Sequence, residues 1–183
     1  MADAPVRVTA RGPLEIVQVA TFGDAPDTAQ RLSKHFGIAI TPAPNRAITS
    51  GDLTVLWHGP DQWLIVRAPG GTALTDELAS VFGEAAAMVD LGHARSVLRF
   101  EGGGLRDVLA MGTSIDLRPA HFAPGACALT ALGKIGALLH AVAPTTIDVY
   151  VPRTYSEAFI EWLEHVCSGI FPVRSALPQP DGD

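Results

Sequence analysis

The chain has few charged residues and no run of basic ones. Only 17% of its 183 residues are Asp, Glu, Lys or Arg, and the formal net charge is −6. Proteins that bind nucleic acid do so through clustered Lys and Arg, often with aromatic residues between them. No such cluster occurs here, so we expect no nucleic-acid partner.

Long apolar runs are also missing, although 48% of the residues are hydrophobic and the mean hydropathy is +0.24. No stretch approaches the ~20 residues that a membrane-spanning helix needs. The N-terminus, Met1–Pro5, has neither the charged nor the apolar region of a signal peptide. We therefore expect a sizeable core and no membrane association. With so little charge, some apolar surface is expected for a partner, a well-packed monomer being the alternative.

Cysteine is scarce. Cys127 and Cys167 lie far apart in the chain and form no CxxC pair. Free thiols in a reducing compartment are the simplest interpretation, and we expect a cytoplasmic protein.

Motifs that carry chemistry are absent too. GxGxxG, GxxxxGK[ST], GxSxG and HExxH do not occur, and the six histidines form no metal-ligand spacing. The triple glycine Gly102–Gly104 lies between an expected strand and an expected helix, where a plain turn is favoured over a phosphate-binding loop. The sequence therefore predicts no catalytic, cofactor-binding or metal-binding residue in this chain.

What is present is a clear hairpin pattern over residues 53–66. The apolar runs Leu53–Trp57 and Trp63–Val66 flank a short Gly-Pro-Asp turn that ends at Asp61. Core packing is the ordinary role of Trp57 and Trp63, although tryptophan is also frequent at interfaces.

Periodicity predicts an α+β fold of two related halves, 14–85 and 86–170, each a mixed or antiparallel sheet covered by helices. Residues 53–83 and 138–169 repeat one order: strand, turn, strand, break, helix. We expect a loose leader over 1–13, a loop over 41–51 and a disordered tail over 171–183. Strands are expected over 14–20, 53–57, 63–66, 86–91, 95–101, 126–134, 137–142 and 147–151, and helices over 24–36, 74–82, 105–111 and 154–168.

The segment Asp90–Arg95 brings an acid, an imidazole and a guanidinium within six residues, in Asp90, His93 and Arg95. They could form a charge-assisted network or contact a ligand. A tight turn with a structural Asp–Arg pair is the alternative, and structure or interface is favoured over catalysis.

Nine residues form the candidate interface or structural network. They combine the side-chain types that anchor protein interfaces with the polar groups near them. They are Trp57, Asp61, Trp63, Asp90, His93, Arg95, Arg118, Arg153 and Tyr155.

Four segments in this order resemble the gamma-subunit family of the heterotetrameric sarcosine oxidases. They are WHGPDQWL (57–64), VDLGHAR (89–95), FAPGACALT (122–130) and VYVPRTY (149–155). The chain departs from the pattern at Gly92, where relatives often have serine. Residues 88–117 are also similar to the folate-binding aminomethyltransferases of glycine cleavage.

The resemblance implies a fold similar to the folate-binding aminomethyltransferase domain and a non-catalytic, structural role. Such complexes demethylate sarcosine oxidatively to glycine and transfer the one-carbon unit to tetrahydrofolate. FAD, FMN, NAD, tetrahydrofolate and zinc are then expected on the alpha, beta and delta subunits, with no cofactor in this chain. A stand-alone folate-dependent one-carbon transferase and a scaffold homodimer are the alternatives.

Overall fold

The structure is a computed structural model that describes residues 6–22, 25–41, 43–167 and 173–176. The chain forms two compact units, each with its own sheet. Unit 1 comprises residues 1–12, 96–124 and 129–183, and unit 2 comprises residues 13–95 and 125–128. Two sheets with few helices confirm the expected α+β class.

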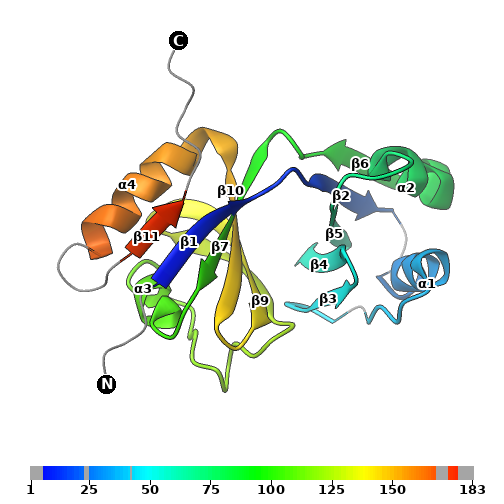
Figure 1. Ribbon diagram of the computed structural model, residues 1–183. Helices are drawn as coiled ribbons and strands as arrows, with labels where there is room; N and C mark the ends of the chain where they lie inside the picture. Colours follow the sequence, from blue (N-terminus) through cyan, green and yellow to red (C-terminus); the bar gives the residue numbers. More distant parts are fainter. Residues whose placement is uncertain (1–5, 23–24, 42, 168–172, 177–183) are drawn as a thin grey trace, which may run out of the picture. The chain divides into compact units, whose positions relative to one another are not determined.

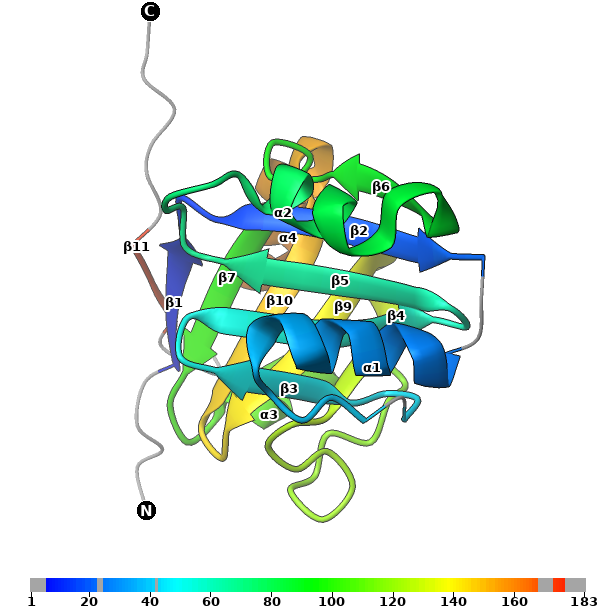
Figure 2. The same cartoon turned by 90° about the vertical axis from the view of Figure 1, so that its right-hand side faces the viewer.

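Unit 2 contains a five-stranded sheet in the order β3-β4-β5-β2-β6. Its pairings β3–β4, β4–β5, β5–β2 and β2–β6 are all antiparallel. Figure 2 shows α1 and α2 on one face of this sheet. The elements are β2 (Glu15–Thr21), α1 (Ala25–Phe36), β3 (Ala47–Ser50), β4 (Leu53–Gly59), β5 (Gln62–Arg67), α2 (Leu74–Phe82), the 3-10 helix η1 (Gly83–Ala85) and β6 (Ala86–Asp90).

The unit 2 core lies between the sheet and its two helices. Valine, isoleucine and tryptophan side chains at alternate strand positions meet apolar side chains on one face of each helix. The cluster includes Val19, Ile65 and Trp63 from the sheet, and Leu32 and Leu78 from the helices.

Unit 1 contains a six-stranded sheet in the order β11-β1-β7-β10-β9-β8. β1 pairs antiparallel with β7 and parallel with β11, and β10 pairs antiparallel with β9. Figure 1 shows α4 along this sheet. The elements are β1 (Val6–Arg11), β7 (Arg95–Glu101), α3 (Leu105–Ala110), β8 (Cys127–Leu132), β9 (Ile135–Ala143), β10 (Thr146–Pro152), the 3-10 helix η2 (Arg153–Tyr155), α4 (Ser156–Cys167) and β11 (Val173–Ala176).

Helix α4 packs on the sheet through aromatic side chains. The Phe159 and Phe100 rings lie edge to face with centroids 6.4 Å apart. The Trp162 ring lies against the backbone at Gly112 and Gly133, where an added Cβ would overlap it. These glycines allow the indole to approach the backbone closely.

The predicted repeat is confirmed as element order, since β4-β5-α2 is followed later by β9-β10-α4. Three expectations differ from the structure. Residues 6–11 of the expected leader form β1, and residues 47–50 of the expected loop form β3. In the expected tail, residues 173–176 form β11, and the rest lies outside the described residues.

The boundary between the expected halves also differs from the division into units. β6 was expected at the start of the second half, but it pairs antiparallel with β2, so residues up to Arg95 belong to unit 2. β1 joins unit 1 because it pairs with β7. Both assignments depend on pairing partners that are remote in sequence, which periodicity does not reveal.

Candidate functional site

The β4–β5 hairpin places the two tryptophans opposite each other. Trp57 pairs with Trp63 in the register of the two strands. Trp63 is only 2% exposed and belongs to the helix-side core, and Trp57 packs against the same core. Packing is therefore the structural role of both tryptophans.

Asp61 closes this hairpin in a left-handed conformation, with φ of 55°. Asp tolerates that conformation better than most residues. The Asp61 carbonyl accepts a 2.9 Å hydrogen bond from the amide of Thr21, which ties the turn to the end of β2. Its position is thus explained by turn geometry.

The Asp90–Arg95 segment is a tight turn after β6. Asp90 Oδ1 accepts a 2.8 Å hydrogen bond from the Gly92 amide, and the amides of Ala94 and Arg95 both donate to the Leu91 carbonyl. The tight turn of the alternative interpretation is present, but the Asp90–Arg95 ion pair that belonged to it does not form among the described residues. The carboxylate is used locally by the turn backbone instead.

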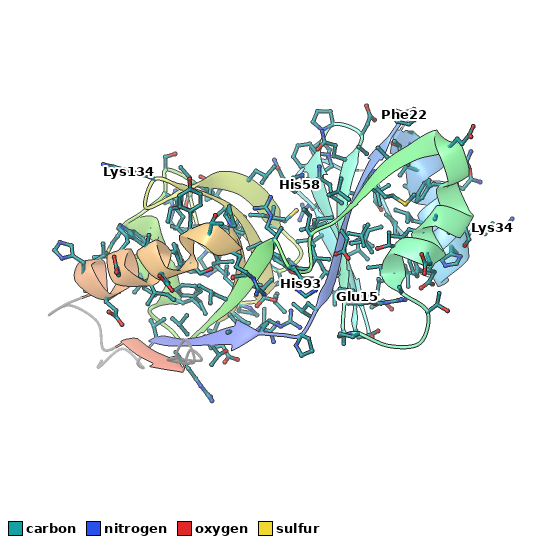
Figure 3. All side chains as sticks on the ribbon, turned by 90° about the horizontal axis from the view of Figure 1, so that it is seen from above. Glu15, Phe22, Lys34, His58, His93 and Lys134 are labelled. Atoms are coloured by element: carbon teal, nitrogen blue, oxygen red, sulfur yellow. The ribbon has the colours of Figure 1, made fainter. Side chains whose placement is uncertain are left out.

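Arg95 acts on the partly buried imidazole of His58. Burial lowers the pKa of the Arg95 guanidinium. Burial, and next the Arg95 charge, lower the pKa of His58, whose two ring nitrogens have no hydrogen-bond partner among the described residues. His93 is exposed in the turn after β6, whereas His58 lies on β4, as Figure 3 shows. The two histidines therefore belong to different elements.

The remaining candidates, Arg118, Arg153 and Tyr155, are exposed and belong to unit 1. Arg118 forms several hydrogen bonds with the Asp116 carboxylate. Tyr155, in η2, is 54% exposed. Asp61 lies beside Thr21 at one end of β2, while Asp90 pairs with Val17 nearer the other end. Six of the nine predicted residues thus belong to unit 2, where Asp61 and Asp90 lie toward opposite ends of β2, and the other three belong to unit 1.

The most concentrated charge in unit 1 was not predicted. Asp148 on β10 is 1% exposed, although a charged side chain on a strand normally faces water. Arg99 on β7 donates to both its oxygens, at 2.7 and 2.9 Å, and Arg11 on β1 donates to Oδ2 at 2.8 Å. The carboxylate is therefore fully used inside the protein, in charge-assisted bonds.

His140 lies opposite Asp148 in the β9–β10 register. It is 3% exposed, and its buried Nδ1 atom has no hydrogen-bond partner in the described part of the chain. Burial lowers the pKa of His140 to about 4, although the Asp148 charge acts in the opposite direction. This imidazole is neutral at physiological pH.

A second charged cluster lies in unit 2 and was also missed. Glu15, labelled in Figure 3, accepts from Arg67 at 2.8 Å and from the Leu74 amide at 3.0 Å, at the first residue of α2. Arg67 also pairs with Glu77, whose other oxygen lies 2.8 Å from His35 Nε2. Burial acts to raise the pKa of Glu77, but the hydrogen bonds from His35 and Arg67 lower it.

A pocket of about 350 Å³ lies beside this cluster, lined among others by Phe36, Asp52 and Arg67. That volume is at the low end for small-ligand sites. The Arg67 guanidinium is already held by Glu15 and Glu77, so its charge is not available to an anionic ligand.

The thiols are buried. Burial raises the pKa of Cys127 to about 12, and its Sγ atom donates to the Trp57 carbonyl at 3.6 Å. Burial also raises the pKa of Cys167. Such thiols are inert, because the reactive form is the thiolate.

Within the described ranges, no three His, Cys, Asp or Glu side chains gather in a way that could hold a metal ion. Among the described helices, none combines the length and the apolar character that a membrane crossing requires.

The amino-acid sequence matches one family model. The model of the sarcosine oxidase, gamma subunit family covers residues 22–169. The chain belongs to this family. Similar proteins include the sarcosine oxidase gamma subunits of Arthrobacter sp, 34% identical over 110 residues, and of Corynebacterium sp. (strain U-96), 32% identical over 118 residues.

These two matches cover 60% and 62% of this chain, and 54% and 57% of the respective relatives. The chain thus matches just over half the length of its curated relatives. Among solved structures, a chain of the heterotetrameric sarcosine oxidase from Corynebacterium sp. U-96, in complex with pyrrole 2-carboxylate, superposes with a TM-score of 0.79 and 25% identity. That match covers 89% of this chain and 84% of the other.

The aminomethyltransferase T of the glycine cleavage system from Bartonella henselae has the same fold. Its TM-score is 0.66 at 12% identity, over 94% of this chain and 48% of that protein. This likeness confirms the expected fold, and the family match confirms the resemblance carried by the four sequence segments.

Proposed function

We propose that this protein is the gamma subunit of a heterotetrameric oxidase that demethylates sarcosine to glycine and transfers the one-carbon unit to tetrahydrofolate. In this proposal the chain supplies structure and contact surface to alpha, beta and delta subunits in the cytoplasm. Those subunits carry FAD, FMN, NAD, the tetrahydrofolate site and zinc. The observation that carries the proposal is the family match over residues 22–169, together with the TM-score of 0.79 to a chain of such an oxidase.

The chemistry of the ionisable groups supports a structural role. Asp148 is engaged by two arginines, and Arg67 by two glutamates. Burial keeps His140 neutral and the Cys127 thiol protonated at physiological pH. General bases and nucleophiles need a group that is poised to exchange a proton near the working pH. These buried groups are instead suited to holding strands together.

The test is co-expression of this chain with the alpha, beta and delta subunits of a sarcosine oxidase from the same organism, with a tag on the alpha subunit. Size-exclusion chromatography of the purified material is expected to show this chain eluting with the other three. Complexes assembled without it are expected to be less stable to heat while retaining bound flavin. Separate elution of this chain from an otherwise intact oxidase would contradict the proposal.

The fold shared with aminomethyltransferase T supports one alternative, a folate-dependent one-carbon transferase that acts alone. Calorimetric titration of the isolated chain with tetrahydrofolate distinguishes the two. We expect no binding heat from the isolated chain. A saturable heat at micromolar ligand would replace the proposed function by the alternative.

The predicted interface adds a second test. Exposed anchors at His93, Arg153 and Tyr155, and half-buried Arg95, are expected to lie near the partner-facing surface. Truncating a true anchor costs about 2 kcal/mol or more of binding free energy. Alanine variants of the four, measured for association with the alpha subunit, would contradict this prediction if all bound as tightly as the wild type.

A further inference from the structure

Strand β6 borders the unit 2 sheet and, among the described strands, has a neighbour on one side only. In the strand order β3-β4-β5-β2-β6 it pairs with β2, and Figure 2 shows it at the border of the sheet. The opposite border is different. There the Ala47 amide donates to the Gly125 carbonyl and the Cys127 amide donates to the Asn45 carbonyl, so residues 125–127 cover part of β3 and the chain before it.

The hydrogen-bond pattern between β2 and β6 shows which backbone groups of β6 point away from β2. The Leu91 amide donates to the Ile16 carbonyl, and the Ala85 carbonyl accepts from the Phe22 amide, so the odd positions face β2. In an antiparallel ladder successive residues alternate between the two sides. The amide and carbonyl groups of Ala86, Met88 and Asp90 therefore point to the outer side of the sheet.

Side chains of β6 form an exposed apolar strip. Val89 is 54% exposed, and Ala87 is exposed as well. In the β2–β6 register, Met88 pairs with Val19 on the helix side, so Ala87 and Val89 share the other face of the sheet.

The edge also lacks the usual protection against pairing. Natural sheets guard such borders with Lys, Pro, bulges or inward-pointing charges. Ala86–Val89 contains none of these residues, and its register with β2 runs without a bulge. A free ladder edge and an apolar strip on the same strand are two independent observations that indicate a strand-shaped partner.

The acidic residues at the two ends of β6 indicate which kind of segment would pair with it. Glu84 before β6 and Asp90 at its end are both exposed acids. An antiparallel pair of two copies centred on Met88 would place Glu84 of one copy diagonal to Asp90 of the other, at both ends, and like charges at such positions are unfavourable. The net charge of −6 opposes self-association further. An apolar strand flanked by Lys or Arg satisfies both ends.

We infer that the free edge of β6 binds an extended apolar segment with flanking Lys or Arg, contributed by a partner subunit, which adds a strand to the unit 2 sheet. The inference rests on the proposed function for the identity of the partner. In this mode main-chain hydrogen bonds supply affinity, and the alternate side chains supply selectivity. Ala87 and Val89 would contact the side chains on one face of the added strand.

Hydrogen–deuterium exchange on the co-expressed oxidase and on the isolated chain tests this directly. The amides of Ala86, Met88 and Asp90 are expected to exchange at least about tenfold more slowly in the complex, because they gain acceptors. The Thr49 amide on β3 also points away from its neighbouring strand and is the reference. Equal exchange of the three β6 amides in both samples overturns the inference.

A charge substitution supplies a second readout. Val89→Lys places a cation on the strand where the partner also carries cations, and the matched control is Met111→Lys, at a residue that is 45% exposed after α3. Val89→Lys is expected to weaken association with the other subunits about tenfold or more, and Met111→Lys to leave it within about twofold. Circular dichroism of both variants checks that they fold like the wild type.

The outcomes separate this inference from the proposed function. If the wild-type chain does not assemble with the oxidase subunits, the proposed function fails. If it assembles and β6 is neither protected nor sensitive to Val89→Lys, only the edge inference fails. If the isolated chain is dimeric by light scattering with β6 already protected, the occupant is a second copy, and the inference is overturned.

Discussion

Replacing Asp148 by asparagine tests whether the unit 1 sheet depends on its central charge cluster. The substitution keeps the size of the side chain and removes its charge. It also turns one carboxylate oxygen into an amide donor that faces an arginine. Arg99 and Arg11 would lose their common acceptor, and His140 would lose its charged neighbour in the β9–β10 pair.

The magnitude follows from burial. Removing one partner of a buried ion pair costs about 3–5 kcal/mol, because the remaining charge is left without compensation. The Arg11 and Arg99 side chains keep 33% and 28% of their surface exposed, so water can rehydrate them in part. We therefore expect the lower end, about 3 kcal/mol, which for a chain of this length lowers the melting temperature by about 6–12 °C.

The assay is urea unfolding of the isolated chain, followed by far-ultraviolet circular dichroism, with thermal unfolding as the second measurement. Asp116→Asn is the matched control, because Asp116 also binds an arginine through both oxygens but does so at the surface. Arg118 lowers the pKa of Asp116, yet water screens the pair, and Asp116→Asn is expected to leave stability nearly unchanged.

A double-mutant cycle of Asp148→Asn with Arg99→Gln is expected to give a coupling free energy of about 1 kcal/mol or more. If Asp148→Asn unfolds at the same urea concentration as Asp116→Asn, the reasoning from burial is refuted. Additivity of the two substitutions in the cycle would refute the direct pairing.

Three further outcomes are expected. In the unfolded state His140 binds a proton below its ordinary pKa of 6.5, whereas in the folded state it does so only near pH 4. The stability of the wild type should therefore fall as the pH is lowered from 6.5 to about 4, and it should fall less steeply in His140→Gln. Iodoacetamide at about pH 8 should leave Cys127 unlabelled until denaturant is added, because burial raises its pKa to about 12. Gly112→Ala should cost about 1–3 kcal/mol by overlapping Trp162, whereas Gly136→Ala, with open space around its Cβ, should be nearly neutral.

Each of these outcomes has its own contradiction. The same pH slope in the wild type and in His140→Gln would show that this imidazole is not kept neutral by the fold. Labelling of the native thiols at the rate of a free cysteine would exclude their burial. Equal stability of Gly112→Ala and Gly136→Ala would show that the Trp162 ring does not lie against Gly112.

The hairpin was predictable because all its determinants are local. Two apolar runs of the right length flank Gly-Pro-Asp, and Asp61 accepts the left-handed conformation that the turn requires. The repeated order of strand, strand and helix was equally visible from spacing. β3 was missed because its four residues carry little periodicity, although its partner β4 follows directly. β1 does alternate, with Val6 and Val8 buried and Arg7 exposed, but its partners β7 and β11 lie far along the chain.

The charge clusters could not be predicted for the same reason. The alternation around Asp148 correctly indicated a strand, and a charged residue in such a pattern normally faces water. Its burial depends on Arg99 and Arg11, which are 49 and 137 residues away. One signal was available in the sequence. Arg99 and Arg11 also stand among the apolar residues of their own strands, β7 and β1, so each of three neighbouring strands carries a charged side chain.

The scarcity of charge connects these clusters with the edge of β6. Arg11 and Arg99 pair with Asp148 inside unit 1, and Arg67 pairs with Glu15 and Glu77 in unit 2. In a chain with only 17% charged residues, charges used inside such clusters are not available to guard strand borders. In a free-standing monomer, selection would favour a lysine or proline in an exposed apolar edge strand, because open edges promote aggregation. A subunit whose edge is covered on assembly is under no such pressure, and the sequence Ala-Ala-Met-Val of β6 is compatible with that second situation.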